Sequence, residues 1–184
     1  GAMTNEILER GANLTAFEID KGFAQLINEF FESYKNEDRF RVIEGDVLKN
    51  WKNQLKERGK PERFFGNLPY NIAATLIANT IEEGIRFDRC VFTVQKEVAL
   101  RMAAKPDTQD YSSFSVICQW AYDIKVIGDL SGSNFWPQPN VDSRSVIFTP
   151  KDNFPNCENP QLFMKMQRAL FSSKASNAVL KTGS

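Results

Sequence analysis

The stretch FFGNLPYNIAATLIANTI, residues 64–81, decides how the chain is interpreted. It opens with apolar residues typical of a buried strand and closes with apolar residues at helical spacing. Between them stands the Asn-Leu-Pro-Tyr segment, residues 67–70, which places a polar amide, a rigid ring and an aromatic side chain where the strand ends. Two interpretations are open. The segment is a plain turn between a strand and a helix, or it forms a pocket that holds a flat, hydrogen-bonding ring.

The composition is that of a globular chain with one main core. Its 184 residues are 42% hydrophobic, enough for one core and a small second unit. Lys and Arg total 23, as do Asp and Glu, which argues against indiscriminate binding to nucleic acid. No apolar run approaches the ~20 residues of a membrane span, and no signal peptide opens the chain. We therefore expect a cytoplasmic protein without a membrane partner.

Cysteine and histidine usage narrows the chemistry. Cys90, Cys118 and Cys157 are an odd number without close spacing, which fits a reducing compartment better than a disulfide framework or a zinc site. The chain has no His, so every His-based catalytic or metal arrangement is excluded. We expect no metal site.

Strand-like and helix-like segments alternate along the chain. We expect strands over 14–20, 40–48, 62–67, 89–95 and 143–151, and helices over 21–36, 51–59, 71–84, 96–106 and 159–173. The segment 112–130 begins like a helix and ends like a strand. This alternation predicts an α/β fold with a doubly wound, mostly parallel sheet.

Acidic side chains follow the first two predicted strands. Glu18 and Asp20 end the first strand, and Asp46 follows the second. Ligands of an open parallel sheet bind beyond the carboxyl ends of its strands, where a carboxylate can accept both hydroxyl protons of a ribose. Asp46 fits an acceptor for the exocyclic amine of adenine, with the backbone N–H of Val47 available to a ring nitrogen. An adenosyl group would use both acids, yet Asp20 could equally cap the next helix and Asp46 could equally be a turn or cap residue.

The segment 67–70 can bind a flat ring that carries an amine. Pro69 has no N–H and a fixed φ, so it holds the turn rigid, and it biases Leu68 toward extended backbone whose carbonyl can leave the sheet. The side-chain oxygen of Asn67 and such a carbonyl can accept both hydrogens of an –NH2 group, while Tyr70 stacks on the ring. An aromatic amine is a poor nucleophile because its lone pair is delocalised, and two acceptors favour a pyramidal, reactive nitrogen. The pattern therefore indicates methylation of an aromatic amine without a general base.

A second aromatic pair stands in SNFWPQPNVDS, residues 133–143. Phe135 and Trp136 are tethered by two prolines and could form the other side of a stacking slot, because a base taken out of its helix is gripped between such side chains. The alternative is a hydrophobic loop packed on the core.

Three stretches together resemble one enzyme family. FFGNLPYNIA (64–73), QKEVALRMAAKPDTQDYSSFSV (95–116) and FWPQPNVDS (135–143), in this order and spacing, closely resemble the KsgA-type ribosomal RNA adenine dimethyltransferases. These are Rossmann-like class I methyltransferases that depend on S-adenosylmethionine. The resemblance covers residues 1–150, and the NVDS sequence at 140–143 favours this family over the related Erm enzymes.

The resemblance implies roles for individual residues. Glu18 would bind the ribose of S-adenosylmethionine, and Asp46 its adenine amine, with Val47 beside it. Asn67 would contact both cofactor and target adenine. Leu68 and Pro69 would shape the acceptor site. Tyr70 and Phe135 would bracket the target adenine.

The resemblance also implies segments that the chain lacks. The family's Gly-rich cofactor loop should precede residue 1, and a small helical C-terminal domain should continue past residue 184. We therefore expect a methyltransferase domain over 1–150 without its first strand and Gly-rich loop, and the truncated start of a helical domain over 151–184. Such a chain is expected to bind S-adenosylmethionine weakly and to be inactive by itself.

The function implied is methyl transfer to two adjacent adenines near the 3′ end of small-subunit rRNA during ribosome assembly. The partner would be the immature 30S-type subunit, and the enzyme a cytoplasmic monomer. Two alternatives are open at this point. One is an Erm-type methylase of large-subunit rRNA, and the other is a non-catalytic RNA-binding assembly or transcription factor on the same fold.

Overall fold

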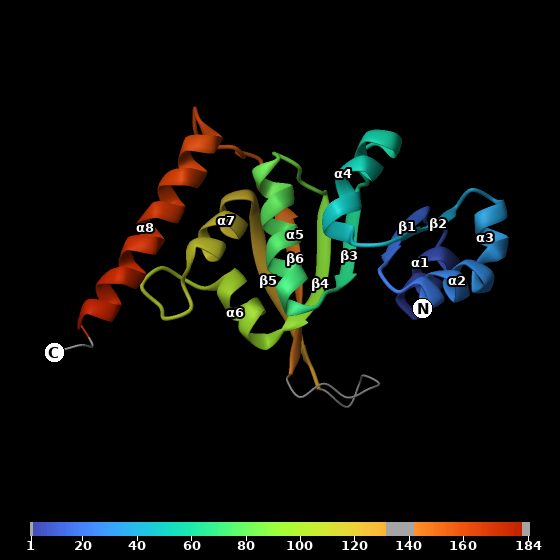
Figure 1. Cartoon of the computed structure of the whole chain (residues 1–184), viewed down its shortest axis with the longest axis horizontal. Coiled ribbons are helices and arrows are strands. Elements are labelled where there is room, and N and C mark those ends of the chain that lie inside the picture. Colours follow the sequence, from blue (N-terminus) through green and yellow to red (C-terminus); the bar gives the residue numbers. More distant parts are fainter. Residues whose placement is uncertain (1, 132–141, 182–184) are drawn as a thin grey trace. The chain divides into compact units, whose positions relative to one another are not determined.

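The computed structural model describes residues 2–131 and 142–181, and the side chains of these except 70, 71 and 173–181 (Figure 1). Contacts within the chain divide it into two compact units, Gly1–Lys60 and Pro61–Ser184, which are described separately here. The boundary expected near residue 150 stays a prediction. No helix among the described residues combines the length and the apolar character that a membrane crossing requires.

The first unit is a two-stranded parallel sheet with helices. Its elements are α1 (Ala2–Glu9), β1 (Leu14–Glu18), α2 (Lys21–Phe30), α3 (Glu32–Asn36), β2 (Phe40–Glu44) and α4 (Val47–Arg58). The register pairs Leu14 with Phe40 and Glu18 with Glu44, so both strands end at the same level. Its buried core consists of Leu8, Phe31 and Phe40.

Two boundaries in this unit differ from the sequence-based expectation. The helix expected over 21–36 is interrupted at Phe31, whose buried ring lies 5.2 Å from that of Phe40. The strand expected over 40–48 ends at Glu44, and the helix expected from residue 51 begins at Val47. The reason is Asp46, whose side chain caps the helix and so starts it four residues earlier.

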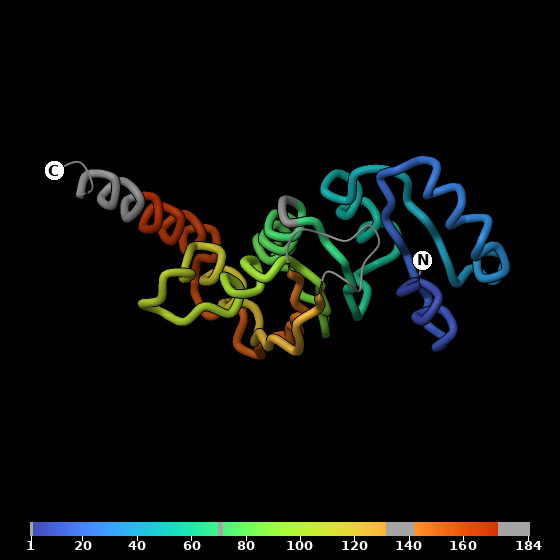
Figure 2. Tube along the Cα trace, turned by 90° about the horizontal axis from the view of Figure 1, so that it is seen from below, coloured from blue at the N-terminus to red at the C-terminus, as the bar shows by residue number. Residues whose placement is uncertain are grey.

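The second unit contains a four-stranded mixed sheet. Its elements are β3 (Arg63–Asn67), α5 (Tyr70–Glu82), β4 (Arg89–Gln95), α6 (Lys96–Ala103), α7 (Ser113–Ala121), β5 (Tyr122–Leu130), β6 (Ser143–Pro150) and α8 (Pro160–Lys181). The strand order is β3-β4-β6-β5, and helices α5, α6 and α7 cover one face of the sheet (Figures 1 and 2). The strand expected at the end of 112–130 is β5, and its helical start is α7.

Parallel and antiparallel pairs are both present in this sheet. The β3–β4 pair is parallel, whereas β6 is antiparallel to both β4 and β5. Parallel neighbours need a crossover, and α5 provides it between β3 and β4. The β5–β6 pair is antiparallel, with Tyr122 opposite Pro150 and Leu130 opposite Ser143.

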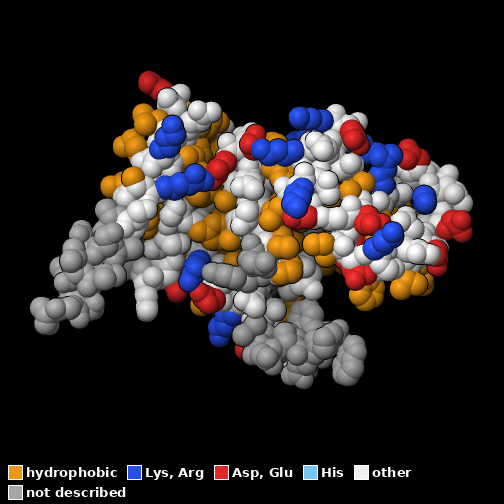
Figure 3. All heavy atoms as spheres, viewed as in Figure 1, with side chains coloured by type: hydrophobic (Ala, Val, Ile, Leu, Met, Phe, Trp, Pro, Cys, Tyr) orange, Lys and Arg blue, Asp and Glu red, His pale blue; other side chains and the backbone are white. Residues whose placement is uncertain are grey.

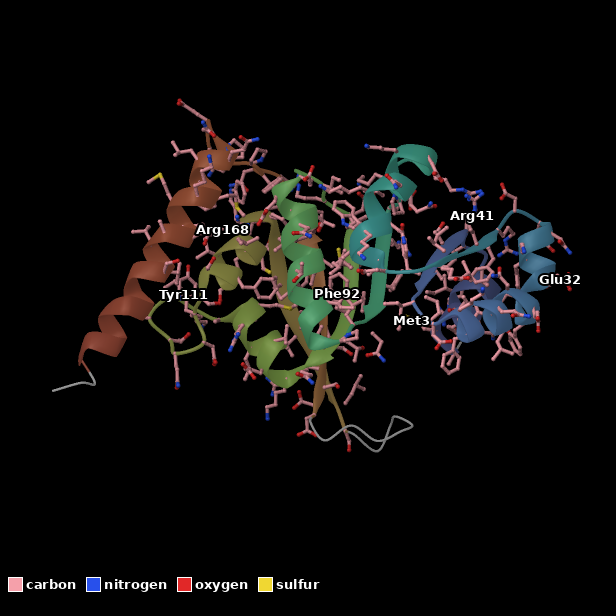
Figure 4. All side chains as sticks on the ribbon, in the orientation of Figure 1. Met3, Glu32, Arg41, Phe92, Tyr111 and Arg168 are labelled. Carbon is pink, nitrogen blue, oxygen red and sulfur yellow. The ribbon has the colours of Figure 1, made fainter. Side chains whose placement is uncertain are left out.

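The core of the second unit lies between the sheet and its helices. Phe92 of β4 sits at its centre (Figure 4), with ring centroids 5.2 Å from Phe64 and 5.4 Å from Phe148 in edge-to-face contacts. At the far end of the helical layer, Tyr111 lies beside α8, its ring centroid 6.0 Å from that of Phe171 (Figure 4). The ring contacts of Phe92 hold β3 and β4 in place, and with them the residues at the carboxyl end of β3.

Candidate active site

The acids at the end of β1 are held by local hydrogen bonds. Glu18 is the last residue of β1, and its Oε1 accepts the N–H of Asp20 at 3.0 Å. Asp20 in turn caps α2 by accepting the N–H of Phe23 at 2.8 Å. Asp20 is therefore the helix cap that the sequence left as one alternative, and Glu18 is the half-buried acid at the strand end.

The connection after β2 lies at the same end of this small sheet. The N–H of Gly45 donates to the backbone oxygen of Glu18 at 2.8 Å, which joins the two strand ends. Gly45 has φ +117°, a backbone region that side chains disfavour, so the sharp turn there depends on glycine. Asp46 then accepts the N–H of Leu48 at 2.9 Å, and Val47 begins α4, where backbone N–H groups lack intrahelical acceptors.

This arrangement has the donor and acceptor chemistry of an adenosyl site. Glu18 and Asp46 are half-buried carboxylates at adjacent strand ends, and the hydrogen bonds found among the described residues occupy one oxygen of each. The remaining oxygens can accept from hydroxyl or amine groups, and the Val47 N–H can donate to a ring nitrogen. The free oxygens of Glu18 and Asp46 and the N–H of Val47 therefore match the hydrogen-bonding groups of a ribose and an adenine.

The segment 67–70 joins β3 directly to α5. Asn67 ends β3 opposite Thr93, and the N–H of Leu68 donates to the backbone oxygen of Thr93 at 3.1 Å. Pro69 has φ −56° and ψ 148°, and its oxygen accepts the N–H groups of Ile72 at 3.1 Å and Ala73 at 2.9 Å. The turn is thus bonded to β4 on one side and to the first turn of α5 on the other.

Within this turn Asn67 is exposed and Leu68 is half-buried against the apolar core of the second unit. The side chain of Asn67 has no hydrogen-bond partner among the described residues. An exposed amide on a fixed backbone is available to an external N–H donor. The amine-binding role of Asn67 stays a prediction that this geometry permits.

The two predicted stacking residues fall outside what can be described. Tyr70 is the first residue of α5, but its side chain is outside the described residues. Phe135 belongs to 132–141, which is also outside them.

A hollow of about 300 Å³ beside α2, α3 and β2 contains none of the predicted site residues. Sequence reasoning missed Thr93, because the strand partner of a residue cannot be identified from one sequence.

Comparison with solved structures defines the class of protein. A dimethyladenosine transferase from Plasmodium falciparum matches with a TM-score of 0.71 and 25% identity, covering 86% of this chain and 55% of that one. The 23S rRNA methyltransferase ErmE matches with a TM-score of 0.68 and 21% identity, covering 91% of this chain and 65% of that one. The fold is therefore that of the Rossmann-like methyltransferases, as expected from the sequence.

Comparison of sequences identifies the family. The family model described as ribosomal RNA adenine dimethylase matches residues 1–181. Ribosomal RNA small subunit methyltransferase A of Treponema denticola is 50% identical over 184 residues, all of this chain and 62% of that protein. The protein of the same name from Treponema pallidum (strain Nichols) is 45% identical over 174 residues, 95% of this chain and 59% of that protein. The chain belongs to the ribosomal RNA adenine dimethylase family, and it spans about 60% of the length of these relatives.

Proposed function

We propose that this chain carries the catalytic residues of an enzyme that methylates the exocyclic amines of two adjacent adenines near the 3′ end of small-subunit rRNA. The observation that carries the proposal is the exposed Asn67 amide on the turn between β3 and α5, in a chain of this family. The relatives named small subunit methyltransferase A support the small subunit as the source of the substrate, in preference to the large one.

The proposed chemistry at the turn needs acceptors and no base. Asn67 Oδ1 and the backbone carbonyl of Leu68 would accept the two N–H groups of the target adenine. The nitrogen lone pair would then leave conjugation with the ring and become nucleophilic. Tyr70 and Phe135 would hold the unstacked base between their rings. The proton would leave after methyl transfer, because an alkylated ammonium is acidic enough to lose it to solvent.

The cofactor of the proposed reaction is S-adenosylmethionine, which supplies an electrophilic methyl group when bound. Glu18 would accept its ribose hydroxyls, and Asp46 and Val47 would recognise its adenine. The donor and acceptor groups at the ends of β1 and β2 support these assignments.

The proposed partner is RNA within an immature small ribosomal subunit, and the proposed enzyme is a cytoplasmic monomer. Acidic and basic side chains are interspersed over the face seen in Figure 3. Phosphate contacts supply most of the affinity of non-specific RNA binding. Recognition by this chain is therefore expected to depend on the folded subunit more than on bulk positive charge.

The test is methyl transfer to immature small subunits by the enzyme as the organism makes it. Asn67→Ala should lower kcat by about 100- to 1000-fold, the usual cost of removing one acceptor or donor aimed at the reacting group. Asn53→Ala, an exposed amide on α4, is the matched control and should leave kcat unchanged. The product is identified as dimethyladenine by mass spectrometry of the digested rRNA.

The same assay separates the alternative functions. Transfer to isolated large-subunit RNA instead of small subunits would indicate an Erm-type enzyme. Absence of transfer to either RNA, with intact RNA binding, would indicate a non-catalytic assembly factor. Transfer that survives Asn67→Ala would contradict the proposed role of the turn.

A further inference from the structure

Gly66 lies one residue before Asn67, where β3 leads into the turn. Its φ is outside the left-handed region, so its backbone does not require glycine. A β-carbon at this position would lie 2.8 Å from Cγ of Leu68, 2.9 Å from Cδ2 and 3.3 Å from Cδ1. Carbon atoms in contact lie about 3.5–4.0 Å apart. The side chain of Leu68 therefore occupies the space that a side chain at residue 66 would need.

Leu68 has little room to retreat from that position. Its N–H donates to the backbone oxygen of Thr93 at 3.1 Å, which holds its backbone on β4. Its side chain packs against the apolar core of the second unit. A protein core is packed as densely as an organic crystal, so this half-buried side chain finds no empty space on the side that faces the core.

Both ends of the segment are also fixed. Gly66 pairs with Phe92 within the β3–β4 ladder. Pro69 has a rigid φ and accepts the first hydrogen bonds of α5. A clash between residues 66 and 68 that Leu68 cannot relieve by moving toward the core therefore rotates the peptides between them. These peptides carry the Asn67 side chain and the Leu68 carbonyl.

We propose that Gly66 is a positioning residue for the methyl acceptor. Its missing side chain lets Leu68 fold back over the strand end, and this contact sets the direction of Asn67 Oδ1 and of the Leu68 carbonyl. The inference rests on the proposed function, because these two oxygens are the groups assigned to the target amine. Gly66 itself touches neither substrate nor cofactor.

The first test is Gly66→Ala in the enzyme as the organism makes it, with immature small subunits as substrate. A misplacement of about 1 Å at reacting groups costs up to about 100-fold in rate. We expect kcat to fall by about 10- to 100-fold, with the KM for the subunit unchanged. Gly128→Ala is the matched control, because no atom of the described residues lies within 4 Å of a β-carbon at Gly128 in β5. Its kcat should equal that of the unsubstituted enzyme.

The second test asks whether the effect passes through Leu68. Leu68→Ala removes the three atoms that lie nearest to the new methyl. This substitution should lower kcat by itself, because the turn loses its packing. Adding Gly66→Ala to it should cause no further loss, since coupled neighbours are not additive. A purely structural defect at Gly66 would instead lower the free energy of unfolding and leave the kcat of the folded enzyme unchanged.

The outcomes separate the inference from the proposed function. If the unsubstituted enzyme transfers no methyl group to adenine, the proposed function fails and the inference fails with it. If that enzyme is active and Gly66→Ala matches it, or the two losses add, only the inference is overturned. Should Gly66→Ala not fold, the comparison of Leu68→Ala with the double variant decides alone. Equal kcat values support the inference, and a further loss overturns it.

Discussion

At the scale of single residues, one buried hydrogen bond joins β5 to the segment before β4. The N–H of Phe87 donates to the hydroxyl of Tyr122 at 3.0 Å, and both residues are buried. Tyr122→Phe should lower the free energy of unfolding by about 1–3 kcal/mol, because it leaves a buried N–H without a partner. Urea unfolding measures the change as a lower midpoint at constant slope.

Tyr34→Phe is the control for this prediction. Tyr34 is half-exposed, and its hydroxyl has no hydrogen bond among the described residues. Its removal should change the free energy of unfolding by a few tenths of a kcal/mol at most, in line with surface substitutions. Equal effects of the two substitutions would contradict the role of the Tyr122 bond.

The same tyrosine predicts a pH dependence. Burial raises the pKa of Tyr122 above its ordinary value, and the neighbouring Cys90 raises it to a smaller extent. Burial also raises the pKa of Cys118. Above about pH 10 the unfolded chain releases the tyrosine proton while the folded chain retains it. The stability that each group contributes is therefore complete below its ordinary pKa, about 8.5 for cysteine and about 10 for tyrosine, and declines above it by up to about 1.4 kcal/mol per pH unit.

Urea unfolding between pH 8 and 11 tests this dependence. Tyr122→Phe should reduce the alkaline decline, since the substituted ring releases no proton. An identical decline with and without this substitution would show that other groups cause it.

At this scale, the sequence indicated the residue types of the site but not their contacts. Turn chemistry alone was enough to single out Asn67 and Pro69, and the structure places Asn67 exposed at a strand end. Asp20 and Asp46 were ambiguous, because capping a helix and binding a ligand favour the same residue type. The Gly66–Leu68 contact could not be predicted, since it depends on the side-chain rotamer of Leu68 and on the core behind it.

At the scale of elements, α7 is joined to α6 through the side chain of Ser115. Ser115 is fully buried, and its Oγ donates to the backbone oxygen of Arg101 at 2.6 Å and accepts the N–H of Ser112 at 3.0 Å. Ser115→Ala should lower the free energy of unfolding by about 1–3 kcal/mol, because it removes two part-buried hydrogen bonds to backbone groups. Ser33→Ala, an exposed helical serine in α3, should have almost no effect in the same urea titration.

The attachment of α8 gives a second prediction at this scale. The ring of Phe163 lies 4.5 Å from that of Trp120 in α7, centroid to centroid, whereas the adjacent Leu162 is 51% exposed. Phe163→Ala should cost about 2 kcal/mol and speed hydrogen exchange of the α8 amides over 160–172. Leu162→Ala should leave that exchange rate nearly unchanged. Equal rates in the two variants would mean that the aromatic contact does not hold α8.

Element types were easier to predict than element ends or strand directions. The apolar spacing of 21–36 is helical throughout, and only the tertiary contact of Phe31 with Phe40 explains the interruption there. The strand character of 143–151 was visible, but its antiparallel direction was not, because direction depends on which strand it meets in space. The local sequence shows the spacing of apolar residues, which indicates the type of element. It gives little information about which strands pair and in which direction.

At the scale of the whole molecule, the alternation of strands and helices was enough to predict the α/β class. The order β3-β4-β6-β5 was not predictable from that alternation, since it inserts the last strand between two earlier ones. The division at residue 60 was also not predicted. It follows from how the contacts between residues are distributed along the chain, which a composition averaged over 184 residues does not reveal.

This distribution predicts that the two units differ in local stability. The first has a two-stranded sheet and a buried core of Leu8, Phe31 and Phe40, and such small sheets are marginally stable by themselves. The second has a four-stranded sheet and a larger buried cluster that contains Phe92 and Phe148. Native-state hydrogen exchange should therefore give opening free energies for β1 and β2 that are about 2–3 kcal/mol below those for β4 and β6.

One core substitution in each unit tests whether the units open separately. Phe31→Ala should speed exchange in β1 and β2 and leave β4 and β6 as slow as before, because its lost contacts lie in the smaller core. Phe148→Ala, the matched substitution in the larger core, should speed exchange in β4 and β6. If Phe31→Ala speeds exchange equally in all four strands, the chain opens as one cooperative unit. The separate stabilities inferred from the two cores would then be wrong.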